Sequence, residues 1–311
     1  MKKAFLISLL CFSNYCAQAQ YTEIINSKRP GFSESPYSVG TGVYQVEAGF
    51  FYKEINKPVT YSTSQSIGTH LFLRTGQFFE RLEINLALSF QQDEHTFYNL
   101  FKSNYKESGL SRFTLGGKYL IFKQEYADRS KEIRSWKRKY AFDWKRMVPS
   151  VGVYLGVNTN LLGDGFKEEG VTPKVALLLQ NDFTDKLVLI TNIIGDKITG
   201  DHPEYGYIAT ITYAASDRIS MFAENQGVFI KERQNEFHLG AGIAYLASPN
   251  LQFDTSIRTN LERGYTYMYA AVGCSWRLDL HKDSFKTTAK ENRPKRIKKR
   301  GGFFSRLFKR N

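Results

Sequence analysis

A serine paired with a histidine can hydrolyse an ester, and this is the chemistry that the chain comes nearest to offering. The histidines are His70, His95, His202, His238 and His281. Ser66 lies one strand turn from His70, but a hydrolase also needs a third group that orients the histidine, and no motif marks Ser66 as a nucleophile. We therefore expect that the protein is not an enzyme.

Metal ligation is not indicated by the spacing of the acidic residues or of the cysteines. Asp164 and the Glu168–Glu169 pair are expected to be solvated in a loop, with weak calcium binding as the alternative. Cys11 and Cys16 lie in the expected signal peptide, so Cys274 alone remains in the mature chain. This excludes an intrachain disulfide and a cysteine-based metal site. We expect no metal and no cofactor.

Charged side chains recur at one parity of an alternating pattern, which places them on one face of extended chain. The candidates for the lumen of a barrel are Glu47, His70, Arg74, Glu83, Arg112, Lys118, Glu224, His238, Asp254, Arg258 and Arg277. Charges inside a narrow barrel must pair or meet water. Two alternatives follow: a lumen filled by salt bridges in a structural barrel, or a partly open channel of mixed polarity.

The elements that would position these residues are long strands. Apolar residues at 82, 84, 86, 88 and 90 alternate with smaller or polar residues, and period-two alternation indicates a strand. A tilted strand that crosses a bilayer needs about 9–11 residues, against about 5–6 in a soluble protein. Such segments lie near 42–54, 64–75, 80–92, 110–122, 147–158, 172–182, 186–196, 205–214, 218–230, 235–246, 249–260 and 265–279. They predict an all-β, antiparallel up-and-down transmembrane β-barrel of about 12 strands.

The first nineteen residues have the features of a secretory signal peptide. Lys2 and Lys3 precede an apolar run over 4–12, and Ala17-Gln18-Ala19 is a small-x-small cleavage signal. After it, no run of 18 apolar residues suggests a membrane-spanning helix. The compartment is therefore expected to be the outer membrane of a Gram-negative bacterium.

The connections between the strands alternate in length, which sets the expected topology. Those at 182–185, 215–217 and 247–249 are tight, whereas those at 53–63, 93–109, 159–171 and 197–204 are longer. Outer-membrane barrels have short periplasmic turns and long outer loops, so both termini are expected in the periplasm. The expected organisation is a signal peptide (1–19), a periplasmic N-terminal lead-in (20–41), the barrel (42–280) and a basic periplasmic tail (281–311). The lead-in is expected to fold back or to plug the mouth.

The stretch from Arg29 to Phe50 carries a resemblance to a known family. It resembles the N-terminal signature of outer-membrane transporters labelled after the MetA pathway of phenol degradation. The matching positions are Arg29, Pro30, Glu34, Ser35, Pro36, Gly42, Glu47, Gly49 and Phe50. Lys28 departs from the family, which usually has Asp there, so any pairing of that Asp with a lumen arginine is lost. The resemblance implies a transmembrane barrel that transports small solutes.

Net charge is concentrated at two places expected on the periplasmic side. The formal charge is +13, and the tail from Lys282 onward holds 12 basic residues against Asp283 and Glu291. A second basic stretch spans 123–146. An outer-membrane protein does not meet nucleic acid, so we expect no nucleic-acid partner, and anionic lipid, peptidoglycan or an acidic protein is favoured instead.

Both basic stretches also carry large apolar side chains, which are candidates for partner docking. They are Phe303, Phe304, Leu307, Phe308 and Arg306 in the tail, and Trp136 and Trp144 in the connection. The alternatives are a disordered basic tail and an ordinary loop with interface anchors. Two functions follow: a channel or transporter for small solutes, or a non-transporting accessory or scaffold subunit of an outer-membrane complex of the barrel-assembly or secretion type, docked through the tail. Outer-membrane lipid is the expected surrounding in either case.

Overall fold

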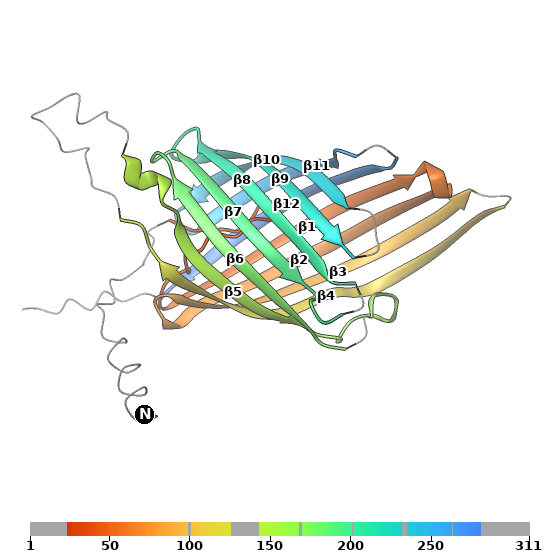
Figure 1. Ribbon diagram of the computed structural model, residues 1–311, viewed down its shortest axis with the longest axis horizontal. Helices are drawn as coiled ribbons and strands as arrows, with labels where there is room; N and C mark the ends of the chain where they lie inside the picture. Colours follow the sequence, from red (N-terminus) through yellow and green to blue (C-terminus); the bar gives the residue numbers. More distant parts are fainter. Residues whose placement is uncertain are drawn as a thin grey trace, which may run out of the picture. The chain divides into compact units, whose positions relative to one another are not determined.

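Alternating side chains along the chain build strands that hydrogen-bond in sequence and close into a barrel (Figure 1). The computed structural model describes residues 24–98, 101–125, 143–167, 170–200, 202–231, 235–262 and 264–280. The expected signal peptide, the basic tail with its docking candidates Phe303, Phe304, Arg306, Leu307 and Phe308, and Trp136 lie outside the described residues.

Twelve strands make up the barrel. They are β1 (Val43–Lys57), β2 (Ser62–Phe79), β3 (Leu82–Tyr98), β4 (Lys102–Phe122), β5 (Ser150–Asn158), β6 (Thr172–Asp182), β7 (Leu187–Asp196), β8 (Glu204–Ala214), β9 (Ile219–Ile230), β10 (Glu236–Ser248), β11 (Leu251–Asn260) and β12 (Thr266–Asp279). Short 3₁₀ helices η1 (Pro58–Thr60), η2 (Trp144–Met147) and η3 (Asp164–Phe166) lie in the connections.

Every strand pairs antiparallel with its neighbours in the chain, and β1 pairs with β12 to close the ring. The closing register runs from Val43 opposite Asp279 to Asn56 opposite Thr266. A closed ring leaves no open edge along the paired lengths of the strands, which is why barrels can cross a bilayer. The predicted antiparallel twelve-stranded barrel is confirmed.

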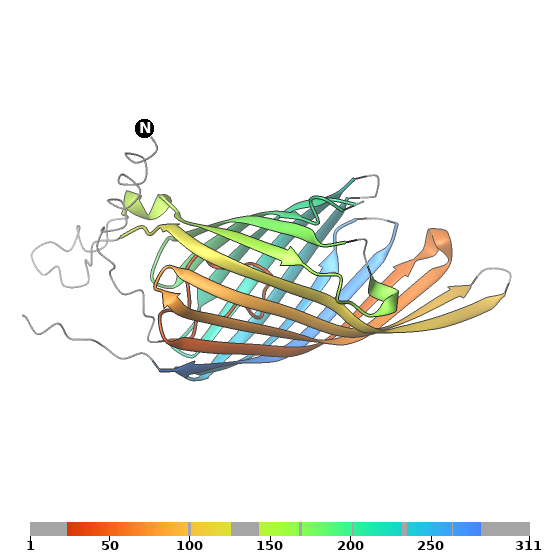
Figure 2. The same cartoon turned by 90° about the horizontal axis from the view of Figure 1, so that it is seen from below.

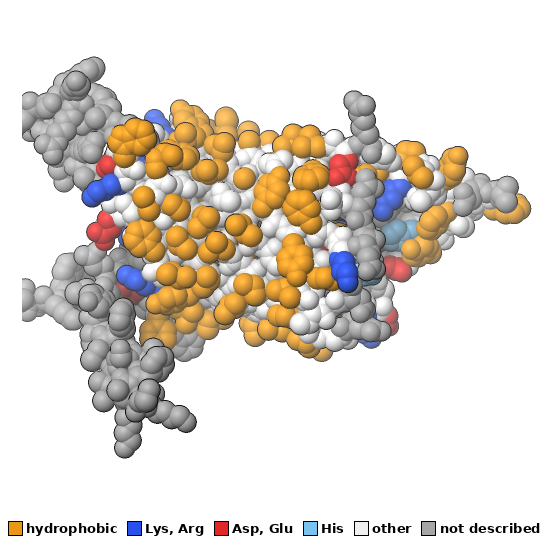
Figure 3. Space-filling view, in the orientation of Figure 1, with side chains coloured by type: hydrophobic (Ala, Val, Ile, Leu, Met, Phe, Trp, Pro, Cys, Tyr) orange, Lys and Arg blue, Asp and Glu red, His pale blue; other side chains and the backbone are white. Residues whose placement is uncertain are grey.

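The outer surface of the barrel is apolar over a broad band (Figure 3). Large apolar side chains on the outward parity are exposed, for example Phe50 at 69%, Ile67 at 65% and Ile257 at 66%. Exposed aromatic side chains gather near one end of the strands, at Tyr44, Tyr119, Tyr213, Tyr245, Phe253 and Trp276. An apolar band with an aromatic girdle fits the hydrocarbon and the interface of a bilayer. Among the described residues, no helix is long and apolar enough to span a membrane.

The two ends of the barrel differ in their connections. At the turn end, residues 80–81, 183–186, 215–218 and 249–250 join consecutive strands, together with the longer connection 123–149. At the loop end, residues 58–61, 99–101, 159–171, 197–203, 231–235 and 261–265 join them. Residues 24–42 enter β1 at the turn end, and β12 finishes there.

Two segments that the sequence predicted as long outer loops are mostly strand, which corrects that prediction. Residues 53–57 continue β1, and residues 93–98 and 102–109 continue β3 and β4 as a hairpin that projects beyond the other strands (Figure 1). Polar residues occupy both faces of this extension, so no apolar alternation marks it in the sequence. Pairing with the neighbouring strand, which periodicity does not report, holds it extended.

The N-terminal lead-in lies inside the barrel at the turn end (Figure 2). Ser33–Pro36 and Ser38–Gly40 are buried. The sequence left open whether this segment folds back or plugs the mouth of the barrel, and assigned it to the periplasm. The described residues 25–40 instead lie within the ring of strands. We call residues 25–40 the plug.

Candidate functional site

The predicted lumen residues lie on the inner parity of their strands, and they fall into two groups. Glu47, His70, Arg112, His238 and Arg258 line an open cavity. Arg74, Glu83, Lys118, Glu224 and Asp254 are buried against the plug or beneath it. Arg277 lies apart from both groups, near Asn250 and Asp279 at the turn end.

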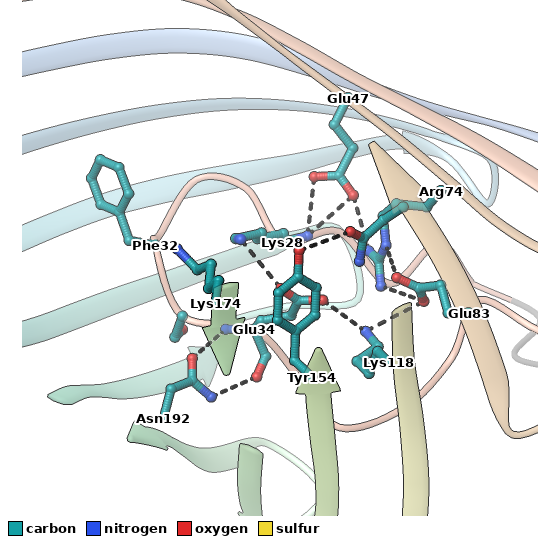
Figure 4. Close-up of polar contacts among 12 residues, drawn as sticks. Lys28, Phe32, Glu34, Glu47, Arg74, Glu83, Lys118, Tyr154, Lys174 and Asn192 are labelled. Atoms are coloured by element: carbon teal, nitrogen blue, oxygen red, sulfur yellow. Dashed lines mark hydrogen bonds and ion pairs between the residues drawn. The ribbon is translucent and has the colours of Figure 1, made fainter. Parts of the chain in front are cut away.

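A chain of alternating charges links the plug to β1–β4 (Figure 4). Lys28 pairs with Glu34 at 3.2 Å, and the other carboxylate oxygen of Glu34 lies 3.2 Å from Lys118. Lys118 pairs with Glu83 at 3.3 Å. Arg74 then joins Glu83 at 2.8 Å to Glu47 at 3.0 Å. Each buried charge therefore meets an opposite one, as a low-dielectric interior requires.

The ionisation of Glu34 depends on this arrangement. Burial raises the pKa of the Glu34 carboxyl, whereas the positive charges of Lys28, Lys118 and Arg74 lower it, and the net result is a pKa of about 2. The carboxylate is therefore charged at neutral pH. Its negative charge is what places it between Lys28 of the plug and Lys118 of the wall.

Two strand carboxylates bind the backbone of the plug. Glu47 accepts hydrogen bonds from the backbone N–H groups of Lys28 and Arg29. Glu224 accepts from the N–H groups of Phe32 and Ser33 at 2.9 and 3.1 Å. A segment without regular structure needs such partners, because unpaired buried N–H groups are costly. The carboxylates thus take the place of a strand neighbour.

Arg29 binds the plug to β11, next to the seam where β1 meets β12. Its guanidinium donates from Nε at 3.1 Å and from Nη2 at 3.0 Å to Asp254 of β11. It lies directly over Gly49 and Gly273, which face each other across β1 and β12. A Cβ at Gly49 would fall 2.4 Å from the guanidinium, and one at Gly273 would fall 2.3 Å from it. The two glycines leave the space that the arginine fills.

Further plug contacts reach β6 and β7. Asn192 accepts from the backbone N–H of Glu34 at 2.6 Å and donates to its carbonyl at 2.8 Å. The Ser35 hydroxyl donates to Gln180 at 2.7 Å. Together with the burial of Ser33–Pro36 and Ser38–Gly40, these contacts show that the plug packs against the wall of the barrel.

A cavity of about 560 Å³ lies between the plug and the loop end. The plug forms its floor through Lys28–Phe32 and Glu34. Its wall is largely aromatic and aliphatic, with Tyr154, Leu178, Tyr207, Ile208, Tyr267 and Tyr269. Charged side chains share this surface, among them Lys53, Arg112, Lys174 and Glu236. A concave space lined by apolar side chains and convergent polar groups is typical of a site for a small molecule.

Several cavity residues were not among the predicted candidates. Lys53 and Lys174 add cations to the wall, and Lys174 pairs with Asp196. Strand parity could have found Lys53 and the inward tyrosines, since they share the inner face with Glu47 and Lys118. The floor could not be predicted in this way, because Lys28 and Phe32 lie in a segment with no periodicity.

Groupings that could bind a metal or catalyse a reaction are sparse among the described lumen residues. Within the described ranges, no group of three or more His, Cys, Asp or Glu residues could hold a metal ion. His70 stacks on Phe51 with ring centroids 4.3 Å apart, and the buried Ser66 hydroxyl, four residues earlier on β2, has no hydrogen-bond partner, His70 included. The structure therefore does not bring the predicted serine and histidine together.

Trp144 begins η2 and is 78% exposed.

Residues 27–278 match the family described as "Putative MetA-pathway of phenol degradation". The chain belongs to this family. No curated protein sequence matches the chain. Among solved structures, an outer-membrane channel from Pseudomonas putida F1 is similar, with a TM-score of 0.51 and 10% identity over 81% of this chain and 100% of that chain. The translocator domain of the autotransporter NalP from Neisseria meningitidis has a TM-score of 0.45 and 10% identity, over 77% of this chain and 89% of that chain.

The likeness to this structure shows that the fold of this family member is a β-barrel of the outer-membrane type. The contacts in this structure also give the family signature a physical meaning. Arg29, Glu34 and Glu47 are among the residues that bind the plug to the wall, and Gly49 makes room for Arg29. Lys28, the departure from the motif, pairs with Glu34 within the plug.

Proposed function

We propose that the protein is a channel for small solutes across the outer membrane, closed at its turn end by the plug. The observation that carries this proposal is the cavity of about 560 Å³, which opens inside the barrel and ends on residues 28–34. A barrel that served only as a scaffold has no need for such a space. A solute enters from the loop end, rests above the plug and passes when the plug shifts.

The orientation proposed for the membrane follows from the connections. The turn end and both termini face the periplasm, and the β3–β4 hairpin faces the outside, as in other barrels with short periplasmic turns. Entry from outside then leads directly into the cavity.

Movement of the plug can be tested with a reversible crosslink. Ser27 Oγ and Ser275 Oγ are 2.7 Å apart, so Ser27→Cys with Ser275→Cys can join the plug to β12 through a disulfide. Cys274 is changed to serine in the same chain to leave no third thiol among the described residues. The full-length variant is reconstituted in liposomes, and solute influx is followed by swelling with and without reductant.

We expect swelling with small sugars and amino acids after reduction and none in the oxidised state. Equal influx in both states means that solutes pass beside a fixed plug. That result would support the channel function and would contradict the movement of the plug. No influx in either state, for the variant and for the wild type, contradicts the channel itself. Reductant added to the wild type is the control.

The accessory-subunit alternative is not favoured by any contact in the described part of the chain. It rests on the tail and on residues 123–146, of which 126–142 and 281–311 lie outside the described ranges. Co-purification from mild detergent, with the native mass measured, separates the two functions.

A further inference from the structure

Two cations in the cavity wall, Arg112 and Lys53, have no carboxylate at ion-pair distance among the described residues. Arg112 lines the cavity from β4 and is exposed there. Within the described residues, no carboxylate lies within ion-pair distance of its guanidinium. The acid whose charge it influences, Asp196, is already paired with Lys174 and accepts a hydrogen bond from Asn158.

The other lumen cations are bound by acids or have acids beside them. Arg29, Arg74, Lys118 and Arg258 each contact at least one carboxylate. Lys53 makes no direct pair either, but its side chain is less exposed than that of Arg112. Arg112 is therefore the more accessible of the two unpaired cations, and it is open to the cavity.

Aromatic rings and a histidine surround the same space. Tyr154, Tyr269 and His70 line this cavity together with Arg112. His238 also lines it, and its Nε2 is buried without a hydrogen-bond partner. The cavity thus offers an apolar aromatic wall, an unpaired guanidinium and a free imidazole nitrogen.

We propose that this cavity binds small aromatic carboxylates, with the carboxylate on Arg112 and the ring against Tyr154 and Tyr269. A guanidinium binds a carboxylate through two parallel hydrogen bonds, which a neutral alcohol or an ammonium cannot reproduce. The aromatic wall accepts the flat ring of the solute. This assignment of a substrate class rests on the proposed channel function, because the cavity would be the waiting position of the solute.

Binding is measured at equilibrium by calorimetry on the purified full-length protein in detergent. The probes are benzoate, benzyl alcohol, benzylammonium and acetate, which separate the contribution of the charge from that of the ring. We expect benzoate to bind at least about tenfold more tightly than each of the others, equivalent to about 1.4 kcal/mol. Arg112→Gln should reduce the preference for benzoate over benzyl alcohol to less than about threefold.

Lys186→Gln is the matched control, because Lys186 is an exposed cation in a turn and lies outside the cavity. It should keep the wild-type preference. Equal affinity for benzoate and benzyl alcohol in the wild type overturns the proposal, as does a preference that survives Arg112→Gln. Heat-modifiable migration of each variant on a gel shows that its barrel is folded.

Failure of this proposal can be told apart from failure of the channel. Binding needs no flux. Selective benzoate binding without any liposome influx would therefore support the binding site and contradict the channel function. Influx of small solutes without a binding preference for benzoate would support the channel function and contradict the binding site.

Discussion

At the scale of single residues, the lumen is organised by buried charge. Arg74 lies between Glu47 and Glu83, and its side chain is 1% exposed. Removal of one partner from such a group leaves an unpaired charge in a low-dielectric setting, which costs more than the pair contributes. Parity identified these residues as inward-facing, but their pairing could not be read from the sequence, because partners such as Lys118 and Glu34 are far apart in the chain.

Arg74→Met should therefore destabilise the barrel, by about 3–5 kcal/mol, since two carboxylates lose their shared cation. The measurement is the temperature at which the folded band is lost in a heat-modifiability series. Lys186→Met, which removes an exposed cation, should change stability by no more than about 0.5 kcal/mol. Equal melting of the two variants would show that Arg74 is not needed to offset the acids.

Gly49→Ala tests whether the position of Arg29 over Gly49 holds the plug in place. The added Cβ would lie 2.4 Å from the guanidinium, so Arg29 must leave Asp254, and the plug loses its attachment to β11. We expect higher single-channel conductance in planar bilayers than for the wild type. Gly117→Ala is the control, because its Cβ meets only Glu83 O at 3.5 Å, an ordinary contact. Unchanged conductance in Gly49→Ala would show that Arg29 does not hold the plug closed.

At the scale of elements, periodicity predicted strand positions well wherever one face of the strand meets lipid. The predicted 172–182 coincides with β6, and 249–260 differs from β11 by two residues. Prediction was poorest at β4, expected from 110 and observed from Lys102, because beyond the membrane no solvent difference between the two faces imposes alternation. The plug was beyond reach for another reason: it has no period, and its partners come from strands throughout the chain.

The β3–β4 hairpin gives a test of orientation. An epitope inserted at 99–101, at its tip, should be accessible to antibody on intact cells, because the hairpin projects from the loop end (Figure 1). The same epitope inserted at 215–218, in a tight turn of the opposite end, should bind antibody only after the cells are permeabilised. The reverse pattern would mean that the barrel is inverted relative to our proposal.

At the scale of the whole barrel, the distribution of side chains is that of a soluble protein turned inside out. Buried charged groups lie on the inner face of the barrel, around the plug and the cavity. The apolar band faces outward (Figure 3). The solvent of the outer face must therefore be lipid or detergent, because so large an apolar surface would associate in water.

Purified protein should show a β-dominated circular dichroism spectrum in detergent and should migrate faster on a gel before boiling than after it. Both follow from a closed ladder of hydrogen bonds that detergent alone does not open. Removal of detergent should precipitate the protein. A largely helical spectrum would contradict the fold.

The place where Arg29 lies has a consequence for how the ring is held shut. Every barrel has a seam at which the first strand meets the last, and here residues from before the first strand cross it. Arg29 lies over Gly49 of β1 and Gly273 of β12 and binds β11, while the Ser27 hydroxyl meets both Glu47 and Ser275 across the same seam. Residues 27–29 thus hold β1 and β12 together at the seam. The strands that separate first when the barrel opens should therefore lie elsewhere in the ring.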